Sequence, residues 1–243
     1  MIRLFVENEL KMGDSVDLTP DQAHYVGRVM RLGAGDGILL FDGRNGEWRA
    51  RIDQIEKRRA RLSVYELTRP QSDDQTITQG PWLAFAPIKK TGTDFIVQKA
   101  TELGVARLMP VHTANSQTDR INLERWGANV IEAAEQCKRL SVPTLDPPQT
   151  LAAMVDAWPQ TRPLIVLDET GGGAPAAAAF KDLIGTPVGF LVGPEGGFQR
   201  AELDRLAKLP FVSAVSLGAR ILRAETACIA TLAAWQAIAG DWR

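Results

Sequence analysis

Glycine-rich turns that follow apolar runs are the features of this chain that most suggest a ligand site. The run 188–192 leads directly into GPEGGF (193–198), and the run 214–218 ends in Leu-Gly before an arginine-rich loop. Glycine adopts positive φ without a steric penalty and lets a ligand approach the main chain, while the Glu195 carboxylate can hold its loop by accepting backbone N–H bonds. At the carboxyl ends of parallel strands, such loops form ligand sites. Two ordinary strand-to-helix turns are the alternative.

A basic segment is the second chemical signal. Residues 44–61 contain seven Lys and Arg side chains against three acidic ones, although the whole 243-residue chain has a net charge of -1. Such a patch attracts phosphate groups. An exposed strand pair with solvated charges is the commoner explanation, so charge alone indicates nucleic acid only weakly.

The sequence lacks the motifs of several other kinds of active site. The chain has no GxxxxGK[ST], GxSxG or HExxH string, and its histidines are His24 and His112. Its two cysteines, Cys137 and Cys228, lie outside any CxxC motif. We therefore expect no metal site and no disulfide framework, which fits a reducing cytoplasm. No apolar stretch approaches the roughly 20 residues of a membrane span, and the first residues lack a signal-peptide layout, so we expect a soluble, cytoplasmic protein.

One glycine motif is interpreted as a turn. GAGDG (33–37) resembles the first loop of a Rossmann methyltransferase, which must follow a strand and open a helix. Here ILLFDG (38–43) follows it, which is typical of a strand that enters a hairpin. The motif therefore predicts a tight turn between strands.

The spacing of apolar runs and turns predicts two domains and a linker. Residues 1–70 alternate short apolar runs with turn dipeptides such as Asp42-Gly43 and Asn45-Gly46, which indicates a small β-barrel or an open sheet. Residues 71–80 contain little that could be buried and predict a linker. From residue 81 to 243, apolar strands alternate with helical patterns, which indicates a mostly parallel α/β sheet with helices on both faces.

The sequence predicts the two ends of one helix in this second domain and the burial of another. We expect the first to be capped by Thr93 and to end at Gly104. The segment 224–239 is apolar nearly all round, which predicts a core helix, a dimer-interface helix, or both.

Several motifs in the same order resemble the RsmE family of ribosomal RNA methyltransferases. They are GPEGGF, SLGARILRAETA (216–227), KTGTDFIVQKATELGV (90–105) and EAAEQCKR (132–139). HYVGRVMRLGAGDGILLFDG (24–43) is similar to the N-terminal PUA-like barrel of that family. The resemblance therefore covers essentially the whole chain.

The resemblance implies a fold and a cofactor. It implies a PUA-like RNA-binding β-barrel at 1–70 and, at 81–243, a SPOUT-type methyltransferase domain whose mostly parallel sheet carries a trefoil knot. It also implies S-adenosylmethionine, held in the loops 167–171, 193–198 and 216–226. The cofactor-binding residues implied are Leu167, Asp168, Glu169, Gly193, Pro194, Glu195, Gly196, Gly197, Ser216, Leu217, Gly218, Ile221, Leu222 and Thr226.

The implied reaction is methylation of N3 of a uridine in 16S ribosomal RNA. The N3 proton must leave, and negative charge then spreads to O2 and O4. Glu225 is our candidate general base, Arg223 the cation that stabilises the oxyanion, and Arg220 the reserve. Alternatively, Glu225 only stabilises the N-terminus of its helix. The transfer requires no metal.

The target base must be unpaired or extruded, because N3 lies on its Watson–Crick edge. Basic side chains are our candidates for the RNA surface: Arg28, Arg31, Arg49, Arg51, Arg58, Arg59, Lys89, Lys90 and Arg139. The substrate would be 16S RNA, within the small ribosomal subunit. The resemblance also implies a homodimer.

The sequence leaves two rival functions open and argues against a third. A related knotted enzyme could methylate a ribose 2′-hydroxyl with similar loops. A non-enzymatic RNA-binding protein could retain the PUA-like platform, although the intact GPEGGF and ILRAETA loops argue against this. A Rossmann methyltransferase built on GAGDG lacks the required helix.

Overall fold

The computed structural model describes residues 1–73, 80–116, 121–170 and 172–243, so most of the predicted linker 71–80 lies outside the described residues. The chain divides into two compact units. The first contains the described part of 1–75 together with the segment Ala134–Val142, and the second contains the remainder. Each unit is described by itself.

The first unit is a five-stranded, mainly antiparallel sheet with the order β1-β3-β4-β5-β2. Its strands are β1 (Arg3–Phe5), β2 (Ser15–Asp17), β3 (Gly37–Phe41), β4 (Glu47–Ile55) and β5 (Ala60–Arg69). Between β2 and β3 the chain forms the short helix α1 (Pro20–His24) and the π-helical turn η1 (Tyr25–Val29), and after β5 comes the 3₁₀ turn η2 (Gln71–Asp73). The predicted β structure of this region is therefore confirmed, with one short helical insertion. Among the described residues no pairing joins the edge strands β1 and β2, so the strand order is that of an open sheet.

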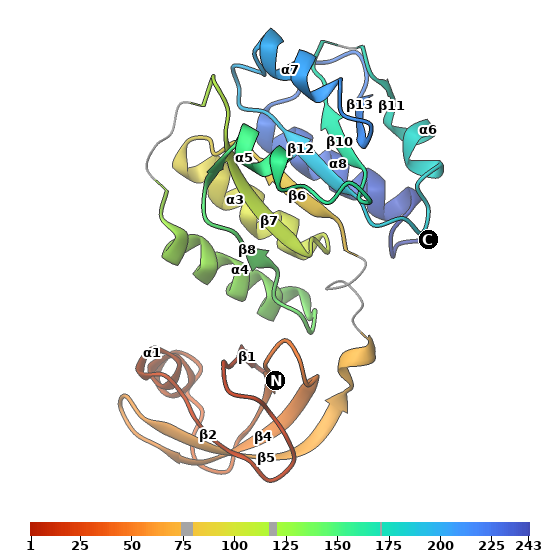
Figure 1. Cartoon of the computed structure of the whole chain (residues 1–243). Coiled ribbons are helices and arrows are strands. Elements are labelled where there is room, and N and C mark those ends of the chain that lie inside the picture. Colours follow the sequence, from red (N-terminus) through yellow and green to blue (C-terminus); the bar gives the residue numbers. More distant parts are fainter. Residues whose placement is uncertain (74–79, 117–120, 171) are drawn as a thin grey trace. The chain divides into compact units, whose positions relative to one another are not determined.

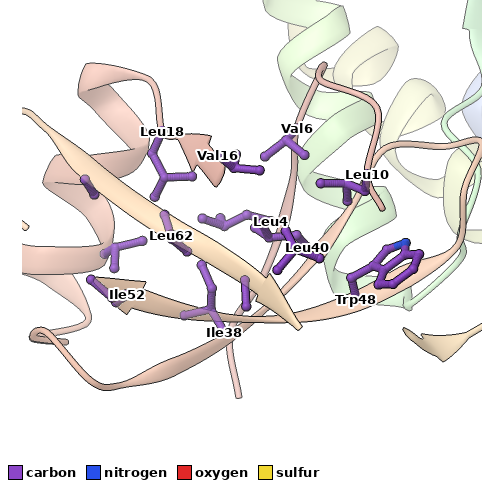
Figure 2. Close-up of a cluster of buried hydrophobic side chains, with 14 of the residues drawn as sticks. Leu4, Val6, Leu10, Val16, Leu18, Ile38, Leu40, Trp48, Ile52 and Leu62 are labelled. Atoms are coloured by element: carbon purple, nitrogen blue, oxygen red, sulfur yellow. The ribbon is translucent and has the colours of Figure 1, made fainter. Parts of the chain in front are cut away.

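A cluster of buried aliphatic side chains and Trp48 forms the core of this sheet (Figure 2). Along β4 the burial alternates, with Trp48, Ala50 and Ile52 inward and Arg49 and Arg51 outward. Period-two alternation is what one buried face of an antiparallel sheet requires. It therefore also places basic side chains on the outer face.

The predicted hairpin between β3 and β4 is confirmed. Gly43 and Gly46 have φ of 80° and 86°, in the left-handed region that favours glycine. The buried Asp42 carboxylate accepts N–H bonds from Arg44 and Asn45 and closes the loop. GAGDG forms the turn that leads into β3, whose first residue is Gly37, and no helix follows it, so the interpretation as a turn is also confirmed.

A buried arginine attaches the segment 134–142 to this sheet. Arg3 donates from Nε to Glu47 Oε2 at 2.6 Å, from Nη1 to the Ala134 carbonyl at 2.8 Å and from Nη2 to the Arg139 carbonyl at 2.5 Å. Its guanidinium also lies 3.6 Å from the centre of the Phe41 ring. One side chain thus satisfies a buried carboxylate and two carbonyl groups.

The second unit is an α/β fold built on a sheet in which every strand pair of the described residues is parallel. The strand order is β11-β13-β10-β12-β6-β7-β8 (Figure 1). β9 also pairs with β7. The strands are β6 (Trp82–Phe85), β7 (Arg107–His112), β8 (Thr144–Leu145), β9 (Gln149–Thr150), β10 (Leu164–Leu167), β11 (Ala174–Pro175), β12 (Gly189–Val192) and β13 (Val212–Ser216).

Helices cover both faces of this sheet, as the continuous burial of β6, β10 and β12 requires. They are α3 (Lys90–Glu102), α4 (Leu123–Cys137), α5 (Leu151–Asp156), α6 (Ala176–Lys181), α7 (Arg200–Leu206) and α8 (Ala224–Ile238). α8 packs with α3 and α6, and Phe180, Phe190 and Trp235 form an edge-to-face aromatic cluster between α6, β12 and α8. Leu151, Met154 and Leu206 of α5 and α7 join a separate core cluster. The α/β prediction is confirmed.

The expected start of the first helix of this unit is wrong. α3 begins at Lys90 with Lys89 as its N-cap, and Thr93 lies within the first turn. The Thr93 hydroxyl donates to the Ile88 carbonyl and accepts from the Ile88 N–H, so it closes a loop that folds back before the helix. The expected end is confirmed, because Gly104 follows the helix with φ of 79°.

The last helix has a buried face within its own unit. Cys228, Leu232 and Trp235 of α8 are buried, so the core-helix interpretation is confirmed. No helix in the described part of the chain is long and apolar enough to span a bilayer.

Replacing Arg3 by Met should destabilise the first unit strongly. The substitution keeps the apolar stem but leaves the Glu47 carboxylate buried without its cation, which costs about 3–5 kcal/mol. Arg49→Met is the matched control, because the Arg49–Glu66 pair is exposed and worth at most about 1 kcal/mol. Urea denaturation measures both free energies of unfolding, and equal losses would contradict the role of Arg3.

Candidate functional site

Three loops meet at one edge of the second unit because of the strand order. β10 lies between β12 and β13, with Val166 aligned with Leu191 on one side and with Ala214 on the other. Since these strands are parallel and in register, the segments that follow their carboxyl ends lie next to one another. Two of these segments are the glycine loops predicted from sequence.

A cavity of about 410 Å³ lies between these loops. This volume is within the range of roughly 300–1,000 Å³ that is usual for small-molecule sites. Its wall contains all the implied cofactor-binding residues except Thr226: Leu167, Asp168, Glu169, Gly193, Pro194, Glu195, Gly196, Gly197, Ser216, Leu217, Gly218, Ile221 and Leu222. Gly171, in the first implied loop, lies outside the described residues.

Two glycines of the GPEGGF loop lie close to neighbouring side chains. A Cβ at Gly197, whose φ is 66°, would collide with the Glu169 carboxylate of the neighbouring loop. At Gly193 it would lie 2.9 Å from the ring of Phe198. The Glu169 carboxylate is the end of a flexible side chain and can move, so the positive φ is the stronger reason for glycine at position 197.

The charge of the cavity wall favours a cationic ligand. Asp168, Glu169 and Glu195 contribute carboxylates, whereas Arg220 is the one basic residue of the wall in the described part of the chain. Asp168 also shapes its own loop, because it accepts hydrogen bonds from the N–H and the hydroxyl of Thr170, at 2.9 and 2.8 Å. A small, positively charged molecule fits both the volume and the charge.

The expected role of Glu195 in holding the loop is wrong. Its side chain is exposed and accepts no backbone N–H bond from the described residues. The loop is held from outside instead: Asn115 Nδ2 donates to the Gly196 and Gly197 carbonyls at 3.0 and 3.1 Å. Asn115 was not a candidate. The signal that could have found it is its place just after β7, at the same edge of the sheet.

The three catalytic candidates lie around the start of α8. Arg220 lines the cavity and is exposed, Arg223 is the N-cap residue of α8, and Glu225 is half-buried in its first turn. In the described part of the chain, none of the three forms an ion pair. Burial, with a contribution from the Glu225 charge, raises the pKa of the Cys228 thiol one turn further on.

Comparison with known proteins identifies the family. Residues 78–236 match the model of an RNA methyltransferase domain, and residues 18–65 match that of an RNA methyltransferase PUA domain. The ribosomal RNA small subunit methyltransferase E of Rickettsia conorii is 32% identical over 95% of this chain and 93% of its own length. The chain belongs to the RsmE family.

Solved structures of similar proteins contain a bound nucleoside cofactor. The RsmE enzyme of Neisseria gonorrhoeae, crystallised with S-adenosylmethionine, has a TM-score of 0.85 and 29% identity over all of both chains. A methyltransferase of Legionella pneumophila, also with S-adenosylmethionine, has a TM-score of 0.84 and 29% identity over 97% of each chain. The N-terminal PUA-like fold and the α/β fold implied by the sequence resemblance are thus confirmed.

Basic side chains of the PUA-like unit gather around η1 and the β4–β5 turn. Arg28 and Arg31 belong to η1 and the turn after it, and Arg58 and Arg59 to the β4–β5 turn; all four are exposed or partly exposed. The two segments are adjacent, because a Cβ at Gly27 would lie 3.1 Å from Ile55 Cδ1. Exposed Tyr25, Val29 and Met30 lie in the same stretch as Arg28. An arginine surface with apolar and aromatic side chains suits unpaired nucleotides.

The other implied RNA contacts differ in accessibility. Arg49 and Arg51 are exposed, but each has an acidic partner. Arg49 Nη1 lies 2.9 Å from Glu66 Oε2, and Arg51 Nε lies 4.0 Å from Asp53 Oδ1. Lys89 is exposed, whereas the Lys90 side chain lies outside the described residues.

Arg139 is not a surface residue. It is buried, and its guanidinium donates to the Ser141 hydroxyl. Its segment also belongs to the first unit and not, as expected, to the second. We therefore withdraw Arg139 as a direct RNA contact.

Among the described residues, no cluster of three or more His, Cys, Asp or Glu could hold a metal ion.

Proposed function

We propose that this chain is an S-adenosylmethionine-dependent methyltransferase that methylates N3 of a uridine in 16S ribosomal RNA. The observation that carries the proposal is the cavity of about 410 Å³, which lies between three loops at the carboxyl ends of β10, β12 and β13 and has an acidic wall. The bound cofactor of RsmE relatives at 29% identity supports it. The finer assignment to uridine N3 rests on the sequence resemblance.

The loops hold the cofactor through main chain and small side chains. Main-chain N–H and C=O groups around Leu217, Ile221 and Leu222 would contact the adenine ring and read its edge. Glu169 and Glu195, on the same wall, would attract the positive charge of the ligand. When bound, S-adenosylmethionine supplies an activated methyl group. Thr226 lies outside the cavity wall, whereas its neighbours Ala224 and Ala227 belong to it.

The residues after β13 prepare the uridine. Glu225 would take the proton from N3, because the neutral imide nitrogen has no lone pair free to react. Arg220 is the arginine that the cavity wall contains, so it becomes the first candidate to stabilise negative charge on O2 and O4, with Arg223 close to it in sequence.

The RNA would dock on the PUA-like unit, through Arg28, Arg31, Arg58 and Arg59. A reactive N3 requires an unpaired or extruded base. We propose 16S RNA, within the small ribosomal subunit in the cytoplasm, as the substrate.

Incubating the protein with S-adenosylmethionine and small subunits from a strain that lacks the modification tests the reaction. Nucleoside mass spectrometry should detect 3-methyluridine. A 2′-O-methylated nucleoside would instead support the rival knotted enzyme, and the absence of any methyl transfer would support the RNA-binding protein without enzymatic activity.

Gly197→Val should abolish cofactor binding while the second unit stays folded, because it brings a β-branched side chain against Glu169 at a positive φ. Gly185→Val is the matched control: its φ is 78°, but a Cβ there meets nothing within 4 Å. Calorimetric titration with S-adenosylmethionine measures the affinity, and thermal denaturation checks the fold. Unchanged affinity of the Gly197 variant would count against the cavity.

The double substitution Arg58→Ala, Arg59→Ala should weaken RNA binding and flatten its salt dependence, by about 0.7 per lost phosphate contact on a log–log plot for single strands. Arg200→Ala, Arg205→Ala removes the same charge from α7 and serves as the control. Filter binding between low and high salt gives both slopes. RNA binding equal to wild type at every salt concentration would remove these arginines from the docking surface.

We also propose a homodimer. β13 lies inside the sheet between β11 and β10, yet its Ser213 and Ala214 side chains are exposed, and Ile221 is 82% exposed. A second copy that covers this region would bury the apolar Ile221 side chain. Light scattering at micromolar concentration should give the mass of two chains, and the mass of one chain would refute the proposal.

A further inference from the structure

The loop after β7 is connected to the GPEGGF loop by side-chain hydrogen bonds in both directions. Asn115 Nδ2 donates to the Gly196 carbonyl at 3.0 Å and to the Gly197 carbonyl at 3.1 Å. In return, Glu202 of α7 accepts the Ala114 N–H at its Oε1, at 2.9 Å. The other oxygen of Glu202 accepts the N–H of Gln199, at the end of the GPEGGF loop. The two loops therefore hold each other.

The Asn115 side chain is itself presented by a closed turn. The Ser116 hydroxyl accepts the Thr113 N–H at 2.9 Å, and the Ser116 N–H donates to the Thr113 carbonyl at 3.1 Å. These bonds lie within the turn and do not involve the glycine loop. Asn115 is thus a preorganised donor on one side of a flexible loop.

The glycine loop needs such a donor. Gly196 and Gly197 belong to consecutive peptide groups, and each can rotate at low cost because glycine adopts both signs of φ. Within the loop itself, the Gly197 N–H bond to the Pro194 carbonyl, at 2.9 Å, orients one of these groups. The Asn115 amide restricts both groups further, because both carbonyl oxygens must point toward it. Fixing two peptide groups in the free protein removes an ordering cost that ligand binding would otherwise incur.

We propose that Asn115 is a positioning residue, which holds the main chain of Gly196 and Gly197 in the conformation that binds the cofactor. The inference rests on the proposed function, since both glycines line the cavity assigned to S-adenosylmethionine. Asn115 acts from behind the loop and is absent from the cavity wall formed by the described residues. Its effect therefore reaches the ligand through the two peptide groups.

Three single variants of the full chain test this role by calorimetric titration with S-adenosylmethionine. Asn115→Ala loses both hydrogen bonds and should raise the dissociation constant about tenfold. Asn115→Asp keeps the shape but cannot donate while ionised, and it faces two carbonyl oxygens, so it should bind at least as weakly at pH 8. Asn129→Ala on α4 is the control, because its amide forms no side-chain hydrogen bond with the described residues; its affinity should equal that of wild type.

A pH series separates positioning from a general loss of structure. Protonation of the carboxylate that Asn115→Asp introduces restores one O–H donor. An aspartate carboxyl ordinarily has a pKa of about 3.9, so the affinity of this variant should rise toward that of wild type as the pH falls from about 8 to about 4. Asn115→Ala should show no such recovery, and thermal denaturation without ligand should find all variants folded.

Each other outcome overturns the proposal. Wild-type affinity in both Asn115 variants would show that the clamp does not position the loop. Equal weakness of both variants at every pH would show that the donated hydrogen bond is not the cause. If wild type itself fails to bind S-adenosylmethionine, the proposed function falls and this inference falls with it.

Discussion

Adjacency of β12, β10 and β13 is the constraint on which the rest of the second unit depends. These strands are separated in sequence, yet parallel pairing aligns their carboxyl ends, so three unrelated loops become one binding wall. Burial on both faces holds this arrangement: aromatic side chains of α6 and α8 pack against β12 on one side, and α5 and α7 pack on the other. The cavity follows from the sheet.

The loops need glycine for their conformation, but they also need to be rigid for tight binding. The positive φ at Gly197 favours glycine, and glycine makes the free loop flexible. Flexibility reduces affinity, because ordering on binding costs conformational entropy. Asn115 and Glu202 form hydrogen bonds with these loops from outside the cavity wall. The wall itself consists largely of small and acidic residues. Shape and rigidity of the site thus come from different parts of the chain.

Local patterns indicate the elements of the fold and the two glycine loops, whereas the resemblance implies the full set of cavity-wall residues. Period-two burial in β4, the turns at Gly43 and Gly46, and glycine after β12 are each encoded within a few residues. The strand order is not encoded in this way, so the resemblance supplied the convergence of the loops. The knotted path that it also implies stays a prediction, because strand order and pairing alone do not define a knot.

The errors arose where a residue's partner lies far away in sequence or on the other side of a loop. Thr93 was expected to cap a helix, but it bonds to Ile88 in a preceding loop. Arg139 has the composition of a surface residue but is buried in a segment that Arg3 attaches to the first unit. Asn115 meets the glycine loop some eighty positions later. Composition and periodicity carry no information about such contacts.

A crystal structure of this protein grown with S-adenosylmethionine tests the central claim most directly. The account predicts electron density for a folded adenosine derivative between the loops that follow β10, β12 and β13, with its adenine ring near Leu217 and Ile221. Density for the ligand at another place, or loops packed against each other without room for the ring, would contradict it.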